Sequence, residues 1–111
     1  MADPETFGQL FESLVFRDLS VYAQAIDARV FAYQDTTAEF DAVVVRDDRW
    51  MGVEVKLSGR PEIIDGAASS MLRLAERMRT PPSALAVVTA TGPSYRRADG
   101  VVVTSILNLG P

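Results

Sequence analysis

Two strand-forming segments with only two residues between them constrain the fold of this chain most strongly. Residues 39–46 and 49–54 are rich in valine and aromatic residues, and Asp47 and Asp48 separate them. A two-residue connection joins antiparallel strands, so we predict a hairpin with this acidic pair as its turn. The turn position makes the numbers of directly paired residues sum to 95. A longer loop would change this register, but an even shift would leave each side chain on its face.

The predicted hairpin brings charged side chains together inside an apolar segment. Asp41 faces Glu54 across the two strands, and Glu39 faces Lys56. Glu54 and Lys56 are two positions apart, so both project from the same face of one strand. Lys56 is the only lysine in the chain, beside ten arginines. Opposed carboxylates repel each other unless a cation holds them, so Asp41 and Glu54 are candidate ligands of a divalent metal ion.

The residue types limit what that metal could be. The chain contains no cysteine and no histidine, which excludes disulfides, thiolate sites and imidazole ligands or bases. Oxygen ligands favour magnesium, manganese or calcium over zinc. A plainer interpretation is also open: Glu54 and Lys56 form a salt bridge at a sheet edge, and Glu39 pairs with Lys56 across the strands.

Composition predicts a single globular domain over residues 1–111. Hydrophobic residues make up 48% of the chain and charged residues 23%, which excludes a disordered protein. No apolar run is long enough for a membrane helix and no leader is evident, so we expect a cytoplasmic protein without a membrane partner.

Charge is unevenly distributed along the chain, although the net charge is only −4. Residues 1–54 hold 11 acids and four arginines, a balance of −7, and residues 55–111 hold four acids and seven bases, a balance of +3. A solvated acidic helix with basic loops explains this split, and so does an acidic metal pocket beside an arginine-bearing rim.

Hydrophobic periodicity places the remaining elements. Apolar residues recur at helical spacing from Phe7 to Ile26, with Asp3 as a candidate cap and Pro4 at the first helical position. A second helix is predicted around residues 67–78, after a break at 58–61. Further strands are predicted at 30–33, 85–89 and 101–106. The order is helix, three strands, helix, two strands, which predicts an α/β (α+β) fold with a mixed sheet flanked by helices.

This order and these acids resemble the PD-(D/E)xK nuclease superfamily, which has a restriction-endonuclease-like core. Asp41 matches the acid of its second strand, Glu54 and Lys56 match its Glu-x-Lys motif, and Glu12 matches an acid often found on its first helix. More narrowly, residues 8–12, 39–41, 54–59 and 95–101 resemble the nuclease-like C-terminal domain of a prokaryotic family of AAA-type ATPases whose function is undefined. The chain has no phosphate-binding loop, so we expect the ATPase module to be absent.

The resemblance implies a metal-dependent nuclease with Asp41, Glu54, Lys56 and Glu12 as its catalytic residues. Asp41, Glu54 and the Val55 carbonyl would bind Mg²⁺ or Mn²⁺. Lys56 would orient the attacking water or accept its proton. Glu12 would bind the metal through water or form a second metal site, unless it is a solvated helix residue or a partner of Lys56. The candidate contacts to nucleic-acid phosphates are Tyr95, Arg96, Arg97, Arg73 and Arg77.

Two functions remain open. The first is a Mg²⁺-dependent nuclease acting on DNA, and the second is a catalytically silent domain that binds protein or DNA. The expected partners are DNA, an AAA-type ATPase module in cis or in trans, and a second copy of the chain, because a domain separated from its ATPase would expose apolar surface. Residues 95–97 also suit a solvated hairpin tip, and Trp50 suits a sheet edge or an interface.

Overall fold

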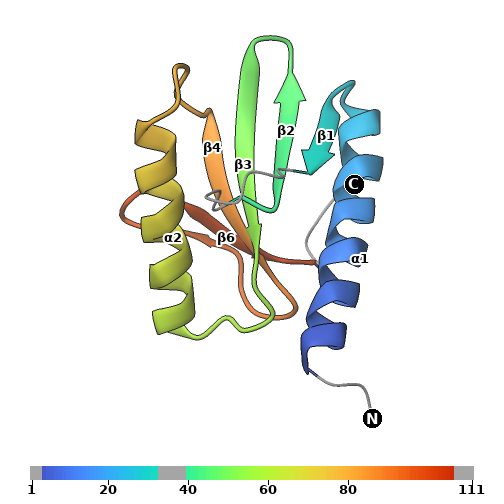
Figure 1. The fold of residues 1–111 in the computed structure, drawn as a ribbon, viewed down its shortest axis with the longest axis vertical. Helices are drawn as coiled ribbons and strands as arrows, with labels where there is room; N and C mark the ends of the chain where they lie inside the picture. Colours follow the sequence, from blue (N-terminus) through green and yellow to red (C-terminus); the bar gives the residue numbers. More distant parts are fainter. Residues whose placement is uncertain (1–3, 33–39, 107–111) are drawn as a thin grey trace.

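The computed structural model describes residues 4–32 and 40–106, which form two helices and one six-stranded sheet. Figure 1 shows the sheet between the two helices, with α2 on the left and α1 on the right. The elements are α1 (Pro4–Ala25), β1 (Arg29–Ala32), β2 (Ala42–Arg46), β3 (Arg49–Val55), α2 (Pro61–Glu76), β4 (Ala84–Thr89), β5 (Tyr95–Arg96) and β6 (Val102–Ser105).

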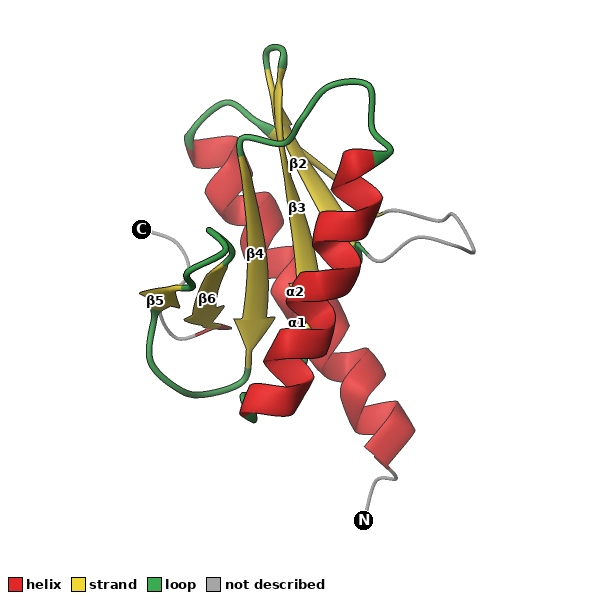
Figure 2. Cartoon of the chain, turned by 90° about the vertical axis from the view of Figure 1, so that its left-hand side faces the viewer, coloured by secondary structure: helices red, strands yellow, loops and turns green. Residues whose placement is uncertain are grey.

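The sheet is mixed, and its strand order is β1-β2-β3-β4-β6-β5. Strands β1, β2 and β3 form an antiparallel meander. Helix α2 connects β3 to β4, and these two strands pair in parallel. Strand β6 then pairs in parallel with β4. Figure 2 shows β4 beside β6, with the short β5 at the outer edge. The mixed sheet with a helix on each side confirms the predicted α+β fold class.

The β2–β3 hairpin has the predicted register. Ala42 pairs with Val53 and Arg46 pairs with Arg49, so each pair of numbers sums to 95. Asp47 in the turn has a φ of 55°, a left-handed conformation that aspartate tolerates better than most residues. Glu39, which we expect opposite Lys56, lies outside the described residues, as does the candidate helix cap Asp3.

Two apolar layers cover the two faces of the sheet. The layer under α1 is built around Val15, Leu19, Val53 and Val55, together with strand residues of β2 and β4. The layer under α2 includes Ile64, Ala68, Met71, Leu85 and Val87. Fully burying a side chain of this size stabilises a protein by about 1.5 to 3 kcal/mol, so both helices are held mainly by these layers.

Phe40 and Gly52 are in close contact on the α2 side of the sheet. A Cβ atom added at Gly52 would lie 2.8 Å from Cε1 of Phe40 and 3.0 Å from Cδ2 of Leu85. The Phe40 ring also meets the Trp50 ring edge to face, with centroids 5.5 Å apart. Phe40 directly precedes Asp41, so this packing holds the backbone next to that carboxylate.

The largest differences from the sequence-based expectation are two element starts and one additional strand. Strand β2 begins at Ala42, three residues later than expected, and a two-residue strand, β5, forms within residues that we expected to be a loop. Helix α2 begins at Pro61, six residues earlier than Ala67. We interpreted Pro61 as a chain break, but proline is also favoured at the first position of a helix, where no backbone N–H is needed. Buried Ile64 completes the apolar side of this first turn.

Candidate functional site

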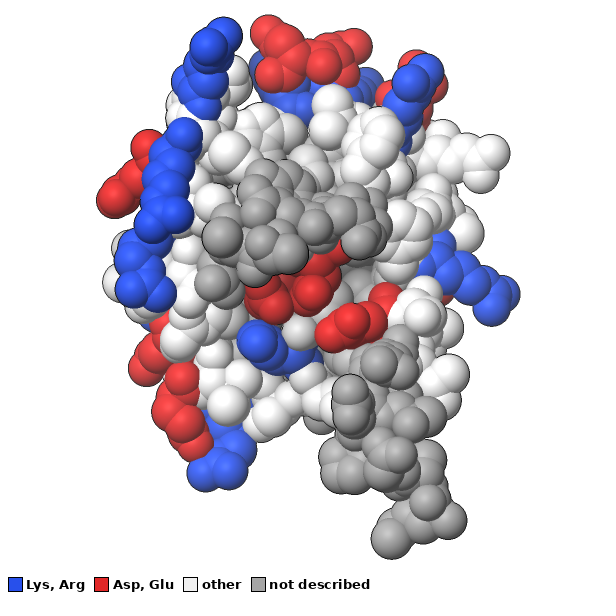
Figure 3. Space-filling view, viewed as in Figure 1, with Lys and Arg blue, Asp and Glu red and all other residues white. Residues whose placement is uncertain are grey.

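Three of the four predicted catalytic residues lie where the β2–β3 ladder ends. Asp41 immediately precedes β2, Glu54 is the next-to-last residue of β3, and Lys56 immediately follows β3. The printed register ends at Ala42 opposite Val53, so Asp41 and Glu54 are the residues that directly flank this last pair. Figure 3 shows acidic side chains gathered with a basic one at the centre of this face, between the two helices.

The Asp41 carboxylate is held by the backbone of β3. The Asp41 N–H donates to the Val53 carbonyl over 2.8 Å, and Asp41 Oδ2 accepts a hydrogen bond from the Val55 N–H over 2.7 Å. The side chain therefore takes the position that a backbone acceptor would occupy if the ladder continued. A backbone N–H donating to a carboxylate is a charge-assisted hydrogen bond, so the orientation of Asp41 is strongly restrained.

Glu54 and Lys56 form an ion pair on the side of the sheet that carries α2. Lys56 Nζ lies 3.7 Å from Glu54 Oε1, and their side chains are 40% and 12% exposed, respectively. Both line a groove of about 290 Å³ against the N-terminal half of α2, together with Glu62, Ile63, Gly66, Ala67 and Ser70. The groove gives the exposed Lys56 ammonium access to solvent and to any bound molecule.

Glu12 reaches the same region from α1. Partial burial raises the pKa of the Glu12 carboxyl, the nearby Asp41 carboxylate raises this pKa further, and the Lys56 ammonium lowers it. These effects require that the charges of Glu12, Asp41 and Lys56 lie within electrostatic range of one another. The fold thus brings the four predicted catalytic residues together from α1 and the two hairpin strands.

The donor set suits a hydrated magnesium ion rather than a closed protein cage. Mg²⁺ commonly takes one or two carboxylates and keeps several waters, and Asp41 with Glu54 supplies two carboxylates. Val55, the third expected ligand, directly follows Glu54 in β3. Among residues 4–32 and 40–106, no group of three acidic side chains is arranged to hold a metal ion. The described residues therefore offer a metal ion two carboxylates, Asp41 and Glu54, without a third acid arranged beside them.

The candidate phosphate-binding residues are dispersed. Tyr95 and Arg96 are exposed on β5, at the far edge of the sheet from β1. Arg73, in the last turn of α2, donates to Ser70, and Arg77 is the C-cap residue of that helix. Figure 3 shows basic side chains along the side of the molecule where α2 lies.

Arg97 is the exception, because it is engaged with two carboxylates. Its guanidinium lies 2.6 Å from Asp65 of α2 and 3.2 Å from Asp99. The hydrogen bond to Asp65 is the main reason that the pKa of Arg97 is raised. Arg97 thereby ties the loop before β6 to α2, and this contact competes with any role in binding phosphate.

The residues of α2 that line the groove were not predicted as site residues from the sequence. Glu62 and Ser70 line it, and Glu62 also pairs with Arg60 over 2.7 Å. The available signal was Pro61. As a helix start, it would have placed the first turn of α2 only five residues after Lys56.

A family model described as "Domain of unknown function (DUF4143)" matches residues 7–109. The chain belongs to the DUF4143 family. The DUF4143 match includes every candidate site residue, from Glu12 on α1 to Arg97 before β6. No curated protein and no solved structure matches the chain. The structure contains no described helix that is both long and apolar enough to span a bilayer.

Proposed function

We propose that this DUF4143 domain is a nuclease-like domain of the PD-(D/E)xK superfamily that hydrolyses phosphodiester bonds of DNA and works with an AAA-type ATPase. The observation that carries the proposal is the convergence of Glu12, Asp41, Glu54 and Lys56 at one end of the sheet. A Glu-x-Lys pair alone is common on sheet edges. Here the pair lies on and next to β3, an interior strand of the sheet, and two further acids accompany it: Asp41 just before β2 and Glu12 from α1.

Each residue has a defined task in this proposal. Asp41 and Glu54 would hold a Mg²⁺ or Mn²⁺ ion, whose chemistry is to neutralise charge on the scissile phosphate and lower the pKa of water. Lys56 lies beside Glu54, where its ammonium can orient the attacking water or, once neutral, accept its proton. Glu12, which lies in electrostatic range of Asp41 and Lys56, would bind such an ion through water or form a second metal site. The restraint on Asp41 from the Val55 amide keeps one ligand in place before any substrate binds.

Exposed cations on two elements are the proposed contacts to DNA. Arg73 and Arg77 lie at the C-terminal end of α2, and Arg96 with Tyr95 lies on β5. Arg77 is 11 residues beyond Gly66 in the groove, which corresponds to about 16 Å along a helix axis. A backbone running along α2 could therefore reach the groove and this basic end together.

One observation favours a second candidate, a catalytically silent binding domain. The Asp41–Val55 hydrogen bond gives Asp41 a structural purpose without any metal, and Glu62 adds negative charge to the groove that phosphate would enter. Affinity for nucleic acid comes largely from neutralising phosphates, so a groove with this charge is poorly suited to bind DNA unless a cation is present.

Metal titration by calorimetry, with plasmid nicking measured on the same samples, separates the two. Wild type is compared with Asp41→Asn, Glu54→Gln and Lys56→Met, and with Glu76→Gln, which removes an exposed acid at the end of α2. We expect Mg²⁺ binding to be lost in the two acid variants and retained in Lys56→Met and Glu76→Gln. Nicking should be lost in the first three variants only.

Mg²⁺ binding without nicking on any DNA would favour the silent domain. Absence of Mg²⁺ and Mn²⁺ binding in the wild type would contradict the nuclease proposal, because the acids would then be structural.

A further inference from the structure

A glycine lies in the middle of α2 at a point where the packing of the chain does not require one. Nothing lies within 4 Å of a Cβ atom added at Gly66, and its φ is not positive. Glycine inside a helix is less favourable than alanine, so the helix itself gains nothing from it. Gly66 does line the groove that contains Glu54 and Lys56. A glycine in such a place lets a ligand approach the backbone closely, which points to a molecule that crosses α2 here.

Ser70 and Arg73 follow Gly66 on the same side of α2. Residues four and seven positions apart lie on one side of a helix, and Ser70 lines the groove. Arg73 Nη2 donates to Ser70 Oγ over 3.3 Å, which holds the guanidinium beside the groove. Within residues 4–32 and 40–106, no carboxylate forms an ion pair with Arg73. Most of the five guanidinium donors are therefore left for a ligand.

The two acids of the groove each have a cation beside them. Lys56 Nζ lies 3.7 Å from Glu54 Oε1, and Arg60 Nη2 lies 2.7 Å from Glu62 Oε1. These ion pairs reduce the repulsion that a phosphate would meet in the groove. Arg73 adds a positive charge about 10 Å along the helix axis from Gly66. A chain with negative charges at intervals is therefore attracted to the Arg73 end of the groove.

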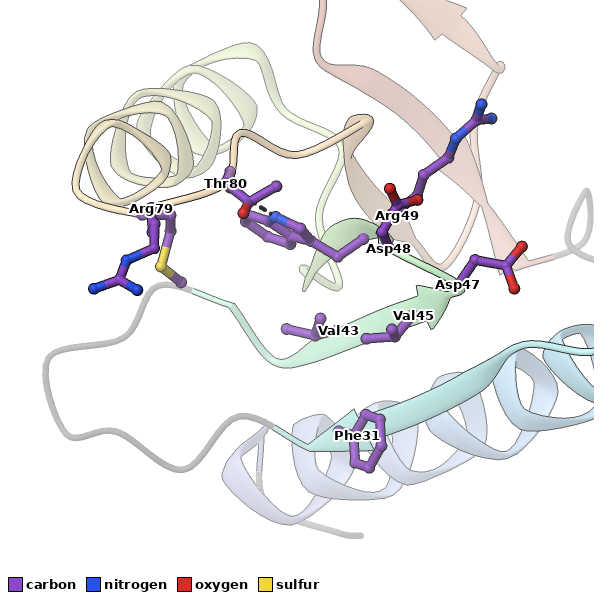
Figure 4. A pocket seen from close by; sticks show the side chains of 10 residues that line it. Phe31, Val43, Val45, Asp47, Asp48, Arg49, Arg79 and Thr80 are labelled. Carbon is purple, nitrogen blue, oxygen red and sulfur yellow. Dashed lines mark hydrogen bonds between the residues drawn. The ribbon is translucent and has the colours of Figure 1, made fainter.

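A larger groove on the molecule lacks these features. Its volume is about 450 Å³, and its lining is mostly apolar, with two aspartates and two arginines whose charges balance. Figure 4 shows this lining, in which the Trp50 indole N–H already donates to the Thr80 carbonyl over 2.8 Å, drawn as the dashed line. An apolar lining without surplus positive charge is poorly suited to a polyanion.

We propose that the groove between β3 and α2 holds one polynucleotide strand whose backbone crosses α2 over Gly66. The scissile phosphate lies at the Lys56 end, and Arg73 binds the phosphate next to it on the same strand. Ser70 is a positioning residue, which directs Arg73 towards the groove. This inference rests on the proposed nuclease function and names its substrate: a strand with at least one further phosphate, not an isolated phosphodiester.

Fluorescence anisotropy with a labelled single-stranded oligonucleotide measures binding of the strand. The Lys56→Met background, in which we expect Mg²⁺ binding without nicking, keeps the strand intact. In this background, Arg73→Gln should reduce the slope of log affinity against log salt concentration by about 0.7, the contribution of one phosphate contact. Arg17→Gln is the matched control, because Arg17 is exposed on α1, on the other side of the sheet. It should leave the affinity and the slope unchanged.

Gly66→Leu tests the path of the strand. Leucine favours a helix more than glycine does, so we expect no fall in Tm. The affinity for the oligonucleotide should fall by about tenfold or more, because the new side chain occupies the groove. Ser69→Leu is the control, since it adds the same side chain at an exposed position of α2 that does not line the groove. Should Gly66→Leu fail to fold, Gly66→Ala should weaken binding in the same direction.

Cleavage kinetics separate Arg73 from the metal site. With Lys56 restored, Arg73→Gln and Ser70→Ala should raise KM for the oligonucleotide with little change in kcat. Ser70→Thr keeps a hydroxyl and should behave like the wild type. Bis-para-nitrophenyl phosphate has no neighbouring phosphate, so its hydrolysis should be unchanged in Arg73→Gln and lost in Asp41→Asn.

Three outcomes would overturn the inference. A wild type that neither binds the oligonucleotide nor cuts DNA contradicts the proposed function, and the inference falls with it. Cleavage that keeps the wild-type KM in Arg73→Gln and Gly66→Leu leaves the nuclease function intact and excludes this path of the strand. Equal losses of strand cleavage and of bis-para-nitrophenyl phosphate hydrolysis in Arg73→Gln would place Arg73 at the metal site instead of at a neighbouring phosphate.

Discussion

The Val55 amide donates its hydrogen bond to the Asp41 carboxylate, 2.7 Å away, where a regular ladder would offer it a backbone carbonyl. This one contact ends the β2–β3 ladder and orients an acidic side chain beside Glu54. The same carboxylate thus serves the fold, and in the proposed function also the metal.

The two roles of Asp41 can be separated with two substitutions. Asp41→Asn keeps an oxygen that can accept from Val55, whereas Asp41→Ala removes it. A hydrogen bond to a charged group is worth about 1.5 to 3 kcal/mol, so we expect Asp41→Ala to lower the free energy of unfolding by that amount and Asp41→Asn by about half or less. Urea unfolding with chelator present measures both. Equal losses would mean that the carboxylate does not act through this hydrogen bond.

Glu12→Gln should stabilise the protein at neutral pH. The folded state raises the pKa of Glu12 above its ordinary value of 4.5, so the folded state binds more protons than the unfolded state as the pH rises through 4.5. Ionised Glu12 therefore costs stability above its raised pKa and costs nothing below 4.5. Because the carboxylate is largely solvated, we expect a gain in Tm of about 1 to 3 °C at pH 7.

Thermal unfolding at pH 7 and at pH 4 checks this prediction. The gain should be mostly lost at pH 4. There the Glu12 carboxyl of the folded wild type is mostly protonated, and the glutamine of the variant carries no charge. Lys56→Met should raise the pKa of Glu12 further, because Lys56 lowers it, and NMR titration of the carboxyl carbon would detect the change. A Glu12→Gln effect that is independent of pH would point to packing instead of charge.

Gly52→Ala should destabilise the protein through contact with Phe40. The new Cβ would lie 2.8 Å from the ring, and overpacking of this kind costs about 1 to 3 kcal/mol. Gly66→Ala is the matched control, since nothing lies within 4 Å of its added Cβ and alanine favours a helix by about 0.8 to 1 kcal/mol. Chemical denaturation of both variants measures the difference. Loss of stability in both would show that the Phe40 contact is not the cause.

Arg97→Gln should loosen the loop before β6, whereas Arg96→Gln should not. Arg97 pairs with Asp65 and Asp99, and we expect its loss to cost about 1 kcal/mol, less at high salt. If β5 contacts DNA, Arg96→Gln would weaken DNA binding without changing stability. Thermal unfolding in low and high salt, with DNA titration by anisotropy, tests both variants. A stability loss from Arg96→Gln equal to that from Arg97→Gln would contradict this distinction.

Local pattern predicted much of the fold, because each signal depends on neighbouring residues. The two-residue turn at Asp47 and Asp48 determines the hairpin register, and alternation puts Glu54 and Lys56 on one face. The predicted start of α2, at residue 67, was wrong because Pro61 is compatible both with a chain break and with a first helical position. The short strand β5 was missed because two residues carry no period of their own.

The sequence alone determined the order of the elements apart from the short strand β5, the register of β2 against β3, and the types of ligand that any metal could have. Only the tertiary structure decided that Glu12 lies near Asp41, that Asp41 binds the Val55 amide, that Asp65 engages Arg97, and that α2 leaves Phe31 uncovered. Strand and helix periods state which side of an element is apolar. They do not state which distant element packs there or how far along the sheet it reaches, because those contacts join residues far apart in the chain.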